Sequence, residues 1–264
     1  MQTRAGKTAR IYTIANQKGG VGKTTTAMNL GCALAKAGKR VLLVDSDAQA
    51  NLTSYLGVTP ARTLDEMYLA KKPLTATELQ TFVHKTRHGV SLIPSDANLN
   101  GVEYYLFSKP RRELMLAGWL GLIRHEYDFI LIDTPPSLNL LTLNALCASD
   151  GVIVPVQPEF FSLEGIVKIR DSIADVRDRW NPNLTIRGIV VTQANMRRKL
   201  TGEVLSALKG EFEDRVFATL IRENSSVSES SGHGKSVLEY APASHGAEDY
   251  GQLSREFIQG EAVV

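Results

Sequence analysis

The sequence has little cysteine, no long apolar run and almost no net charge. Its 264 residues include two cysteines, Cys32 and Cys147, which lie far apart. This spacing excludes a disulfide framework, a CxxC zinc site and a CxxC redox site. No stretch reaches the roughly 18 consecutive apolar residues of a membrane span, and residues 1–7 carry charge without the apolar segment of a secretory signal. We therefore expect a cytoplasmic protein.

The charge balance gives no strong indication of a nucleic-acid partner. There are 30 Lys and Arg against 28 Asp and Glu, a net charge of +2. Taken alone, a local group of basic residues is typical of a solvated surface. Three such groups are candidates for an anionic partner: Arg4, Lys7 and Arg10; Lys109, Arg111 and Arg112; Arg197, Arg198 and Lys199.

Short apolar runs alternate with longer amphipathic ones, which is the pattern of βαβ units. We predict an α/β fold: a doubly wound, mostly parallel sheet with helices on both faces, in a single domain over 1–264 with flexible termini at 1–9 and 259–264. The expected strands are 11–15, 40–44, 90–93, 129–132, 151–156, 186–192 and 216–221. The expected helices are 23–37, 113–124, 138–148, 162–180, 202–212 and 247–258.

A glycine-rich turn follows the first expected strand. It reads K-G-G-V-G-K-T-T over residues 18–25, and the glycines at 19, 20 and 22 let backbone N–H groups approach a phosphate without obstruction by a Cβ. The next helix directs its positive end at the same anion. In such a loop Lys23 reaches the β and γ phosphates, Thr24 offers its hydroxyl to Mg²⁺, and Thr25 bonds the α phosphate. Gln17 stands where the usual motif has glycine, so this phosphate loop is a variant.

Two further expected strands end in carboxylates. Asp45 and Asp47 follow the apolar run 41–44, and Asp133 follows 129–132, at the edge of the sheet where ligands bind in open α/β folds. Asp133 is placed to hold Mg²⁺ through water, as in a Walker B strand. No glutamate follows Asp133 to act as a general base, so we expect slow unaided hydrolysis.

The loop resembles the deviant Walker A motif of the ParA/MinD family of P-loop ATPases, which carries an additional lysine at the position of Lys18. The resemblance implies ATP and Mg²⁺ as cofactors, with residues 18–25 (Lys18, Gly19, Gly20, Val21, Gly22, Lys23, Thr24 and Thr25) around the nucleotide. It also implies a homodimer in which Lys18 contacts the nucleotide of the other subunit. Residues 44–49 are similar to the V-D-x-D-P-Q element of the family, with Ala48 in place of proline. By this likeness Asp47 orients the attacking water or the magnesium shell.

Segments 92–103, 155–165 and 228–250 are similar to ParA proteins of the chromosomal and small-plasmid type. The implied function is a partition ATPase, weak unless stimulated, that closes as an ATP-bound dimer on nonspecific double-stranded DNA at the nucleoid. A ParB-like adaptor would trigger hydrolysis. Only about ten residues precede the first expected strand, so we expect no N-terminal helix-turn-helix domain.

One loop departs from the family pattern. Residues 221–226 read I-R-E-N-S-S where many relatives read I-P-R-N-V-R, a loop that supplies contacts to adenine and basic residues for DNA. Arg222 and Glu223 stay candidates for the nucleotide site, and Asn195 is a candidate adenine neighbour. We assign the DNA contacts to Arg197, Arg198 and Lys199, with Arg222 assisting. The binding is expected to be nonspecific because there is no recognition-helix module.

Three alternative functions were compared with DNA partition. A MinD-like ATPase that cycles on membranes needs a basic amphipathic C-terminal helix, whereas 250–261 has one basic and two acidic residues. An iron–sulfur reductase needs paired cysteines, which Cys147 alone does not supply. A ParA-like ATPase that positions another cargo, such as a carboxysome or a chemosensory cluster, has the same sequence features as a DNA-partition protein.

Overall fold

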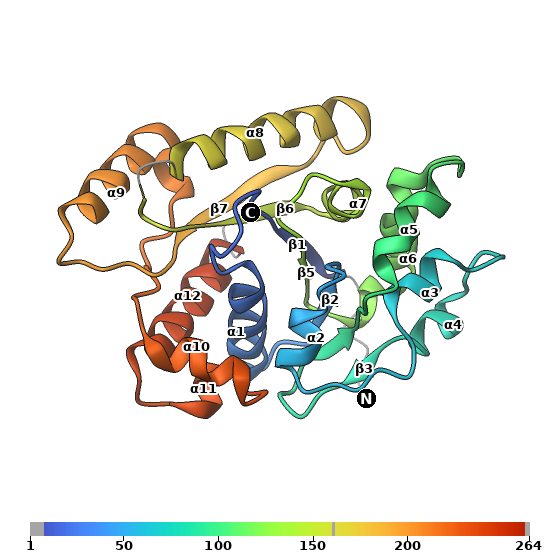
Figure 1. Ribbon diagram of the computed structural model, residues 1–264, viewed down its shortest axis with the longest axis horizontal. Coiled ribbons are helices and arrows are strands. Elements are labelled where there is room, and N and C mark those ends of the chain that lie inside the picture. The colour runs from blue at the N-terminus through green and yellow to red at the C-terminus, as the bar shows by residue number, and fades with distance from the viewer. Residues whose placement is uncertain (1–7, 160–161, 262–264) are drawn as a thin grey trace.

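The computed structural model describes residues 8–159 and 162–261. Within them lies a seven-stranded sheet in the order β3-β4-β2-β5-β1-β6-β7, parallel except for the antiparallel edge strand β3 (Figure 1). This confirms the predicted α/β class. The strands are β1 (Arg10–Ile14), β2 (Val41–Asp45), β3 (His84–Lys85), β4 (Ser91–Ile93), β5 (Phe129–Asp133), β6 (Gly151–Val156) and β7 (Thr185–Val191).

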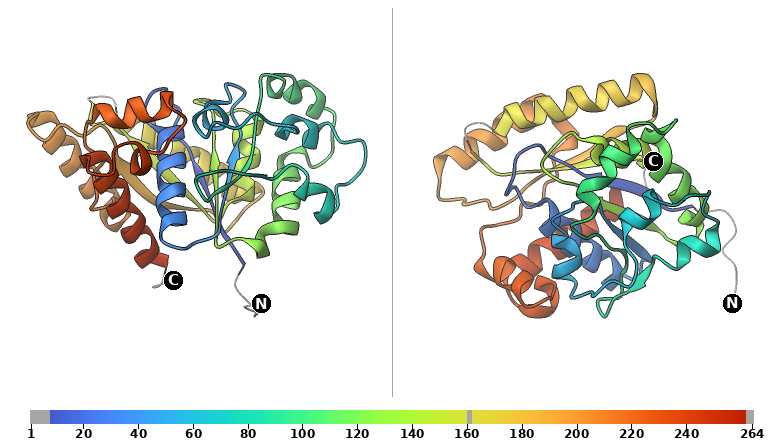
Figure 2. Two further views of the ribbon diagram at one scale, coloured as in Figure 1. Left: turned by 90° about the horizontal axis from the view of Figure 1, so that it is seen from below. Right: turned by 45° about the vertical axis from the view of Figure 1, so that its right-hand side comes forward.

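Helices cover both faces of this sheet (Figure 2). One apolar cluster joins the sheet to α1, α2, α11 and α12, a second joins it to α3–α7, and a third lies under α8 and α9. The helices are α1 (Lys23–Lys36), α2 (Asn51–Tyr55), α3 (Leu64–Tyr68), α4 (Ala76–Gln80), α5 (Leu99–Leu106), α6 (Met115–Ile123), α7 (Leu140–Ala148), α8 (Ser162–Arg179), α9 (Lys199–Phe212), α10 (Ser225–Gly232), α11 (Val237–Tyr240) and α12 (His245–Glu261).

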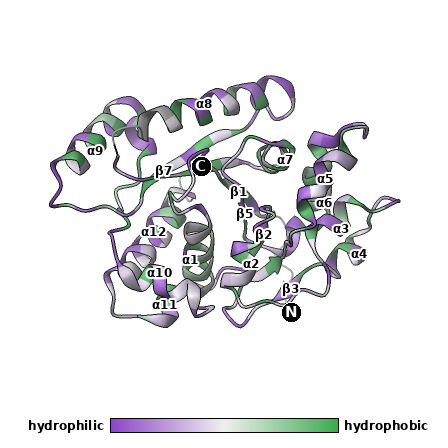
Figure 3. Cartoon of the chain, in the orientation of Figure 1, coloured by the Kyte–Doolittle hydropathy of each residue, from purple (hydrophilic) through white to green (hydrophobic). Residues whose placement is uncertain are grey.

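The central strands are apolar on both sides because helices cover both sides. In β2, for example, Leu43 packs toward α1 while Leu42 and Val44 pack toward the opposite layer. The outer helices α8 and α9 alternate between polar and apolar residues along their length (Figure 3). None of the described helices is long and apolar enough to cross a membrane.

Strand pairing brings the predicted site residues to one edge of the sheet. β1 lies between β5 and β6, so the loop that follows β1 leaves the middle of the sheet. Ile14 and Asp45 are both register partners of Asp133 on β5. The phosphate loop and the two acidic strand ends therefore meet at the carboxyl ends of adjacent parallel strands, as predicted.

The C-terminal helix is bound into the core along its whole length. The Phe257 ring packs edge-on against Tyr12 with the centroids 5.0 Å apart. Glu261 accepts hydrogen bonds from the Tyr12 hydroxyl and, at 2.9 Å, from Arg187 Nε. Burial and this contact raise the pKa of Tyr12 above its usual value. The predicted flexible tail is thus wrong for residues 259–261, and 262–264 and 1–7 lie outside the described residues.

The expected strand over 216–221 is also wrong. This segment makes only isolated bridges, Ile189 with Val216 and Ala194 with Arg222. Between them, the backbone N–H groups of Ala218 and Thr219 donate to the carboxylate of Glu256, at 2.6 and 2.9 Å. A side chain from α12 therefore takes the hydrogen bonds that a continued strand would have made with β7.

Candidate functional site

The phosphate loop is open on one side and faces an uncapped helix. Gly20 and Gly22 have φ of +76° and +84°, a left-handed backbone that favours glycine. A Cβ added at Gly19 or Gly20 would meet no atom within 4 Å. No side chain caps the N-terminus of α1, and its first turn contains no acidic residue. The loop and helix thus leave N–H groups and a positive dipole end available to an anion.

Side chains from two neighbouring strand ends hold this loop in place. The Gly20 carbonyl accepts hydrogen bonds from Gln157 Nε2 at 3.2 Å and from Gln193 Nε2 at 3.0 Å. The Thr192 hydroxyl donates to the Val21 carbonyl at 2.8 Å. The loop is therefore fixed by residues that follow β6 and β7, which the sequence motif does not contain.

The two lysines of the motif occupy different environments. Lys23 is buried, and its ammonium group donates to the carbonyl of Lys18 at 3.1 Å. Burial lowers the pKa of Lys23, an effect that Asp133 and then Asp47 oppose. The Lys18 side chain is more exposed and forms an ion pair with Glu159. Lys23 thus lies inside the loop, while Lys18 lies on its outer surface.

Asp133 is a fully buried carboxylate that lacks a hydrogen-bond partner among the described residues. Burial raises its pKa well above the usual value, and the neighbouring Asp45 adds to this, while Thr24 and Lys23 oppose it only in part. An unpaired buried carboxylate is costly unless a cation or an ordered water satisfies it. The donor set of Asp133, Asp47 and the Thr24 hydroxyl consists of hard oxygen atoms, which fits Mg²⁺ held partly through water.

Asp45 and Asp47 have distinct roles in the same turn. One oxygen of Asp45 accepts from the backbone N–H and the hydroxyl of Thr53, at 2.8 and 2.7 Å, so Asp45 ties α2 to the end of β2. Asp47 accepts from the Gln49 N–H at 3.0 Å. Because Asp45 is committed to the local structure, Asp47 is the better candidate for the expected contact with water or metal.

Asp45 should make the folded protein less stable as the pH rises. Burial raises its pKa from 3.8 to about 6, so between these values the folded state holds a proton that the unfolded chain has lost. The free energy of unfolding therefore falls as the pH rises through that interval. The Asp45→Asn variant lacks this titrating carboxyl group, and we expect its stability relative to the parent to rise by about 2 kcal/mol from pH 4 to pH 6.

Urea unfolding in metal-free and nucleotide-free buffer at a series of pH values measures this difference. Asp178→Asn, at an exposed position on α8, is the matched control and should show no such trend. A stability difference between Asp45→Asn and the parent that is the same at pH 4 and pH 6 would contradict the prediction.

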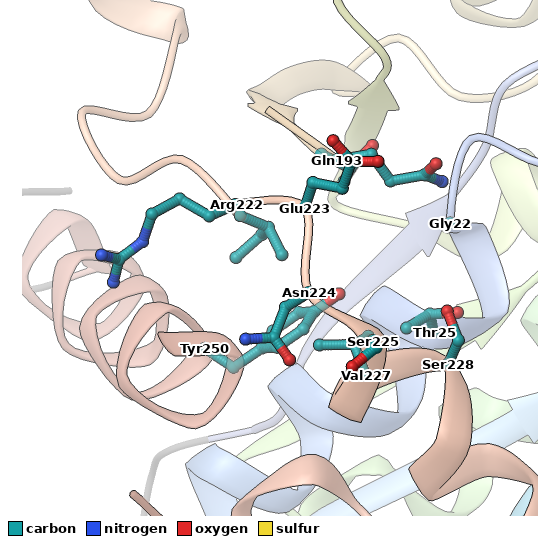
Figure 4. A pocket seen from close by; sticks show the side chains of 12 residues that line it. Gly22, Thr25, Gln193, Arg222, Glu223, Asn224, Ser225, Val227, Ser228 and Tyr250 are labelled. Atoms are coloured by element: carbon teal, nitrogen blue, oxygen red, sulfur yellow. The ribbon is translucent and has the colours of Figure 1, made fainter. Parts of the chain in front are cut away.

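A cavity of about 330 Å³ adjoins the phosphate loop and is lined by residues from α1, the segment that follows β7, the 221–224 loop, α10 and α12 (Figure 4). Glu223, a predicted nucleotide-site residue, lines this cavity, and the Asn195 side-chain amide donates to the Glu223 carboxylate at 3.1 Å. Asn224 and Ser225, from the loop at 221–226, also line the cavity. Five further lining residues were not predicted, because no local motif joins them: Thr192, Gln193, Val227, Ser228 and Tyr250.

Arg222 is one of the residues that line the cavity, and its side chain points toward α12 (Figure 4). The guanidinium group pairs with Glu248 at 2.7 Å and with the buried carboxylate of Asp249, whose oxygen also accepts from the Arg222 N–H at 2.9 Å. Arg222 therefore fixes the 221–224 loop on α12, and its charge is paired with carboxylates of that helix.

The predicted basic patch is exposed at the start of α9. Arg197 and Arg198 have no ion-pair partner in the described part of the chain, and Lys199 pairs with Glu203 at 3.3 Å. The other two groups are partly neutralised, since Arg112 pairs with Glu113 and Arg10 approaches Glu261 at 3.9 Å. Arg4 and Lys7 lie outside the described residues. The 197–199 patch is thus the basic group whose two arginines stay available to an anion.

The fold and the site together define the class of protein. A parallel sheet, a glycine loop leading to an uncapped helix, a buried lysine and an unpaired strand-end aspartate together form a P-loop nucleoside triphosphatase site.

Comparison with known proteins identifies the family within this class. A family profile described as an AAA domain matches residues 9–186. The chain is 44% identical over 257 residues to the chromosome partitioning protein ParA of Caulobacter vibrioides, covering 96% of this chain and 95% of that protein. It is 42% identical to the sporulation initiation inhibitor protein Soj of Bacillus subtilis, covering 94% and 97%. A cobyrinic acid a,c-diamide synthase from Mycobacterium smegmatis, solved with ADP and magnesium, superimposes with a TM-score of 0.80 at 33% identity over 94% and 93%. The chain belongs to the ParA/MinD family of P-loop ATPases.

Proposed function

We propose that this chain is a ParA-type partition ATPase that hydrolyses ATP slowly to ADP and phosphate and uses the nucleotide to control DNA binding. The observation that carries the proposal is the unpaired, buried Asp133 beside the open phosphate loop and Lys23. Lys23 and the loop N–H groups would bind the phosphates, and Thr24, Asp47 and Asp133 would hold Mg²⁺. The bound ion would neutralise developing charge on the phosphates. The 330 Å³ cavity would receive the base and ribose.

The named relatives favour partition over the other activities of similar proteins. The ParA of C. vibrioides is more similar in sequence than the diamide synthase, at 44% against 33% identity. Attachment to a membrane by the C-terminal helix is disfavoured because Tyr250, Leu253 and Phe257 on α12 are buried in the core. We place the protein in the cytoplasm, bound to the nucleoid and stimulated by a ParB-like adaptor.

Lys18 should be required for an ATP-dependent dimer. Its charge lies on the outer surface of the loop, where the nucleotide of a second subunit would meet it, while Lys23 already serves the loop interior. At protein concentrations too low for nucleotide-independent association, we expect Lys18→Ala to bind ATP without forming the ATP-dependent dimer, whereas the parent chain forms that dimer with ATP and not with ADP. Light scattering with each nucleotide measures this. A Lys18→Ala chain that dimerises with unchanged affinity would show that this lysine does not act across an interface.

Dimerisation should also switch DNA binding on. A dimer carries two copies of the 197–199 patch, so about six phosphate contacts would give a slope of log affinity against log salt of about −5, against about −3 for one subunit. We expect Arg197→Glu/Arg198→Glu to abolish duplex binding without changing ATP-dependent dimerisation. A salt series with ATP and with ADP measures both effects. Equal DNA affinity with either nucleotide, or no loss in the double variant, would contradict the assignment of this patch.

A further inference from the structure

Helix α5 presents two of the most exposed aromatic side chains in the described structure. Leu99, Val102 and Leu106 bury one face of the helix. On the outer side Tyr104 is 88% exposed and Phe107, at the end of the helix, is 78% exposed. Exposed apolar side chains that lie together on a soluble protein mark an interaction surface more often than isolated ones do.

The loop after α5 adds an available cation to this surface. Arg111 is exposed, has a left-handed backbone with φ of +54°, and has no ion-pair partner among the described residues. Its neighbour Arg112 bonds the Phe107 carbonyl and lies 5.1 Å from the Phe107 ring centroid, which holds the loop against the helix end. We call Tyr104, Phe107 and Arg111 the α5 knob.

A complementary hollow lies between α7 and α8. It has a volume of about 220 Å³ and is lined by Leu138, Leu143, Val176 and Trp180, with Asp175 also at its wall. Leu138 is 46% exposed, so the hollow offers apolar surface to a partner. Asp175 has no hydrogen-bond or ion-pair partner in the part of the chain described, while the neighbouring Arg179 lies 5.7 Å from the Trp180 ring centroid. We call this hollow the α7–α8 groove.

We propose that the α5 knob of one molecule docks in the α7–α8 groove of a second copy of this chain. The aromatic ring of Phe107 would enter the apolar groove, and Arg111 would pair with Asp175, so that two charges without partners in the described structure of one molecule would meet. Aromatic and arginine side chains are the residue types that dominate protein interfaces. The contact does not involve residues 18–25, which include Lys18, so it is tested without nucleotide and separately from the proposed nucleotide-controlled dimer.

The knob and the groove are different surfaces of one molecule. When a patch on one copy fits a pocket elsewhere on the next, the contact is heterologous and repeats along an open chain unless the rotation closes a ring. Nucleotide-bound dimers joined in this way would load on DNA in clusters, because each dimer carries two knobs and two grooves.

Sedimentation velocity of the full chain without nucleotide, over a series of protein concentrations, tests this proposal. We expect the parent chain to form species larger than a dimer as concentration rises. Phe107→Ser and Leu138→Ser should each lower the association constant at least ten-fold, since both positions are exposed and the fold does not require them. Met196→Ser, which removes a side chain that is 60% exposed and outside both surfaces, should have no effect.

A mixing experiment and a charge exchange make the test specific. An equimolar mixture of Phe107→Ser and Leu138→Ser keeps one working knob and one working groove, so it should form dimers and nothing larger. Arg111→Asp and Asp175→Arg should each weaken association, and the double variant should restore it. The proposal would be overturned by a parent chain that stays monomeric, by single variants that associate like the parent, or by a double variant that does not restore association. It would also be overturned if the α7–α8 groove bound a different protein and not a second copy of this chain.

Discussion

Replacing Lys23 by alanine is expected to abolish measurable ATP binding. The ammonium group is buried within the loop and is held by the Lys18 carbonyl, close to where the phosphates must lie. Removing one partner of a buried, hydrogen-bonded charge pair costs about 2–5 kcal/mol, or roughly 30-fold to several thousand-fold in affinity. Isothermal titration with Mg-ATP measures the loss directly.

Lys36→Ala is the matched control for this experiment, because Lys36 is an exposed lysine in the last turn of the same helix. It should bind ATP as the parent does. A Lys23→Ala chain with the nucleotide affinity of the parent would refute the assignment of residues 18–25 as the phosphate loop, whatever its hydrolysis rate.

Asp47→Ala should separate binding from hydrolysis. Lys23, the loop and the N-terminus of α1 are unchanged in this variant, so ATP affinity should stay within a few-fold of the parent. Turnover should fall by about 10²–10³, the usual cost of losing one group that positions or stabilises the reacting atoms. A phosphate-release assay with the partner present measures turnover, and the ATP-bound dimer should accumulate.

Asp45→Asn serves as the comparison for Asp47→Ala, because Asp45 bonds Thr53 and belongs to the structure of the turn. It should retain most of the turnover. If Asp45→Asn were inactive and Asp47→Ala active, Asp45 would be the residue that positions the attacking water.

Local sequence was sufficient to predict the phosphate loop and the two acidic strand ends. Residues 18–25 are contiguous, and glycine, lysine and threonine act there through their own backbone and side chains. Asp45 and Asp133 were predictable because each follows an apolar run long enough to be a buried strand. Pairing of β2 with β5 then brought the two carboxylates together in register.

The rest of the site depends on contacts between distant segments. Arg222 is paired with two carboxylates on α12. In the expected strand before it, backbone N–H groups donate to Glu256 on the same helix instead of to a neighbouring strand. Nothing within residues 216–223 indicates either partner. The edge strand β3 has two residues and the helices α2, α3 and α4 have five each, which is too short for a periodic pattern to reveal.

The position of β1 also determines when this protein can fold during synthesis. β1 is made first, yet its two neighbours in the sheet are β5 and β6, and the helix packed beside α1 is α12. Contacts between such distant segments form slowly, because a long loop must close before they contribute. Glu261, the last residue of α12, accepts a hydrogen bond from the Tyr12 hydroxyl in β1. A nascent chain that has not yet exposed α12 lacks the helix that packs beside α1, and we expect nucleotide binding to begin only after residues 245–261 have left the ribosome.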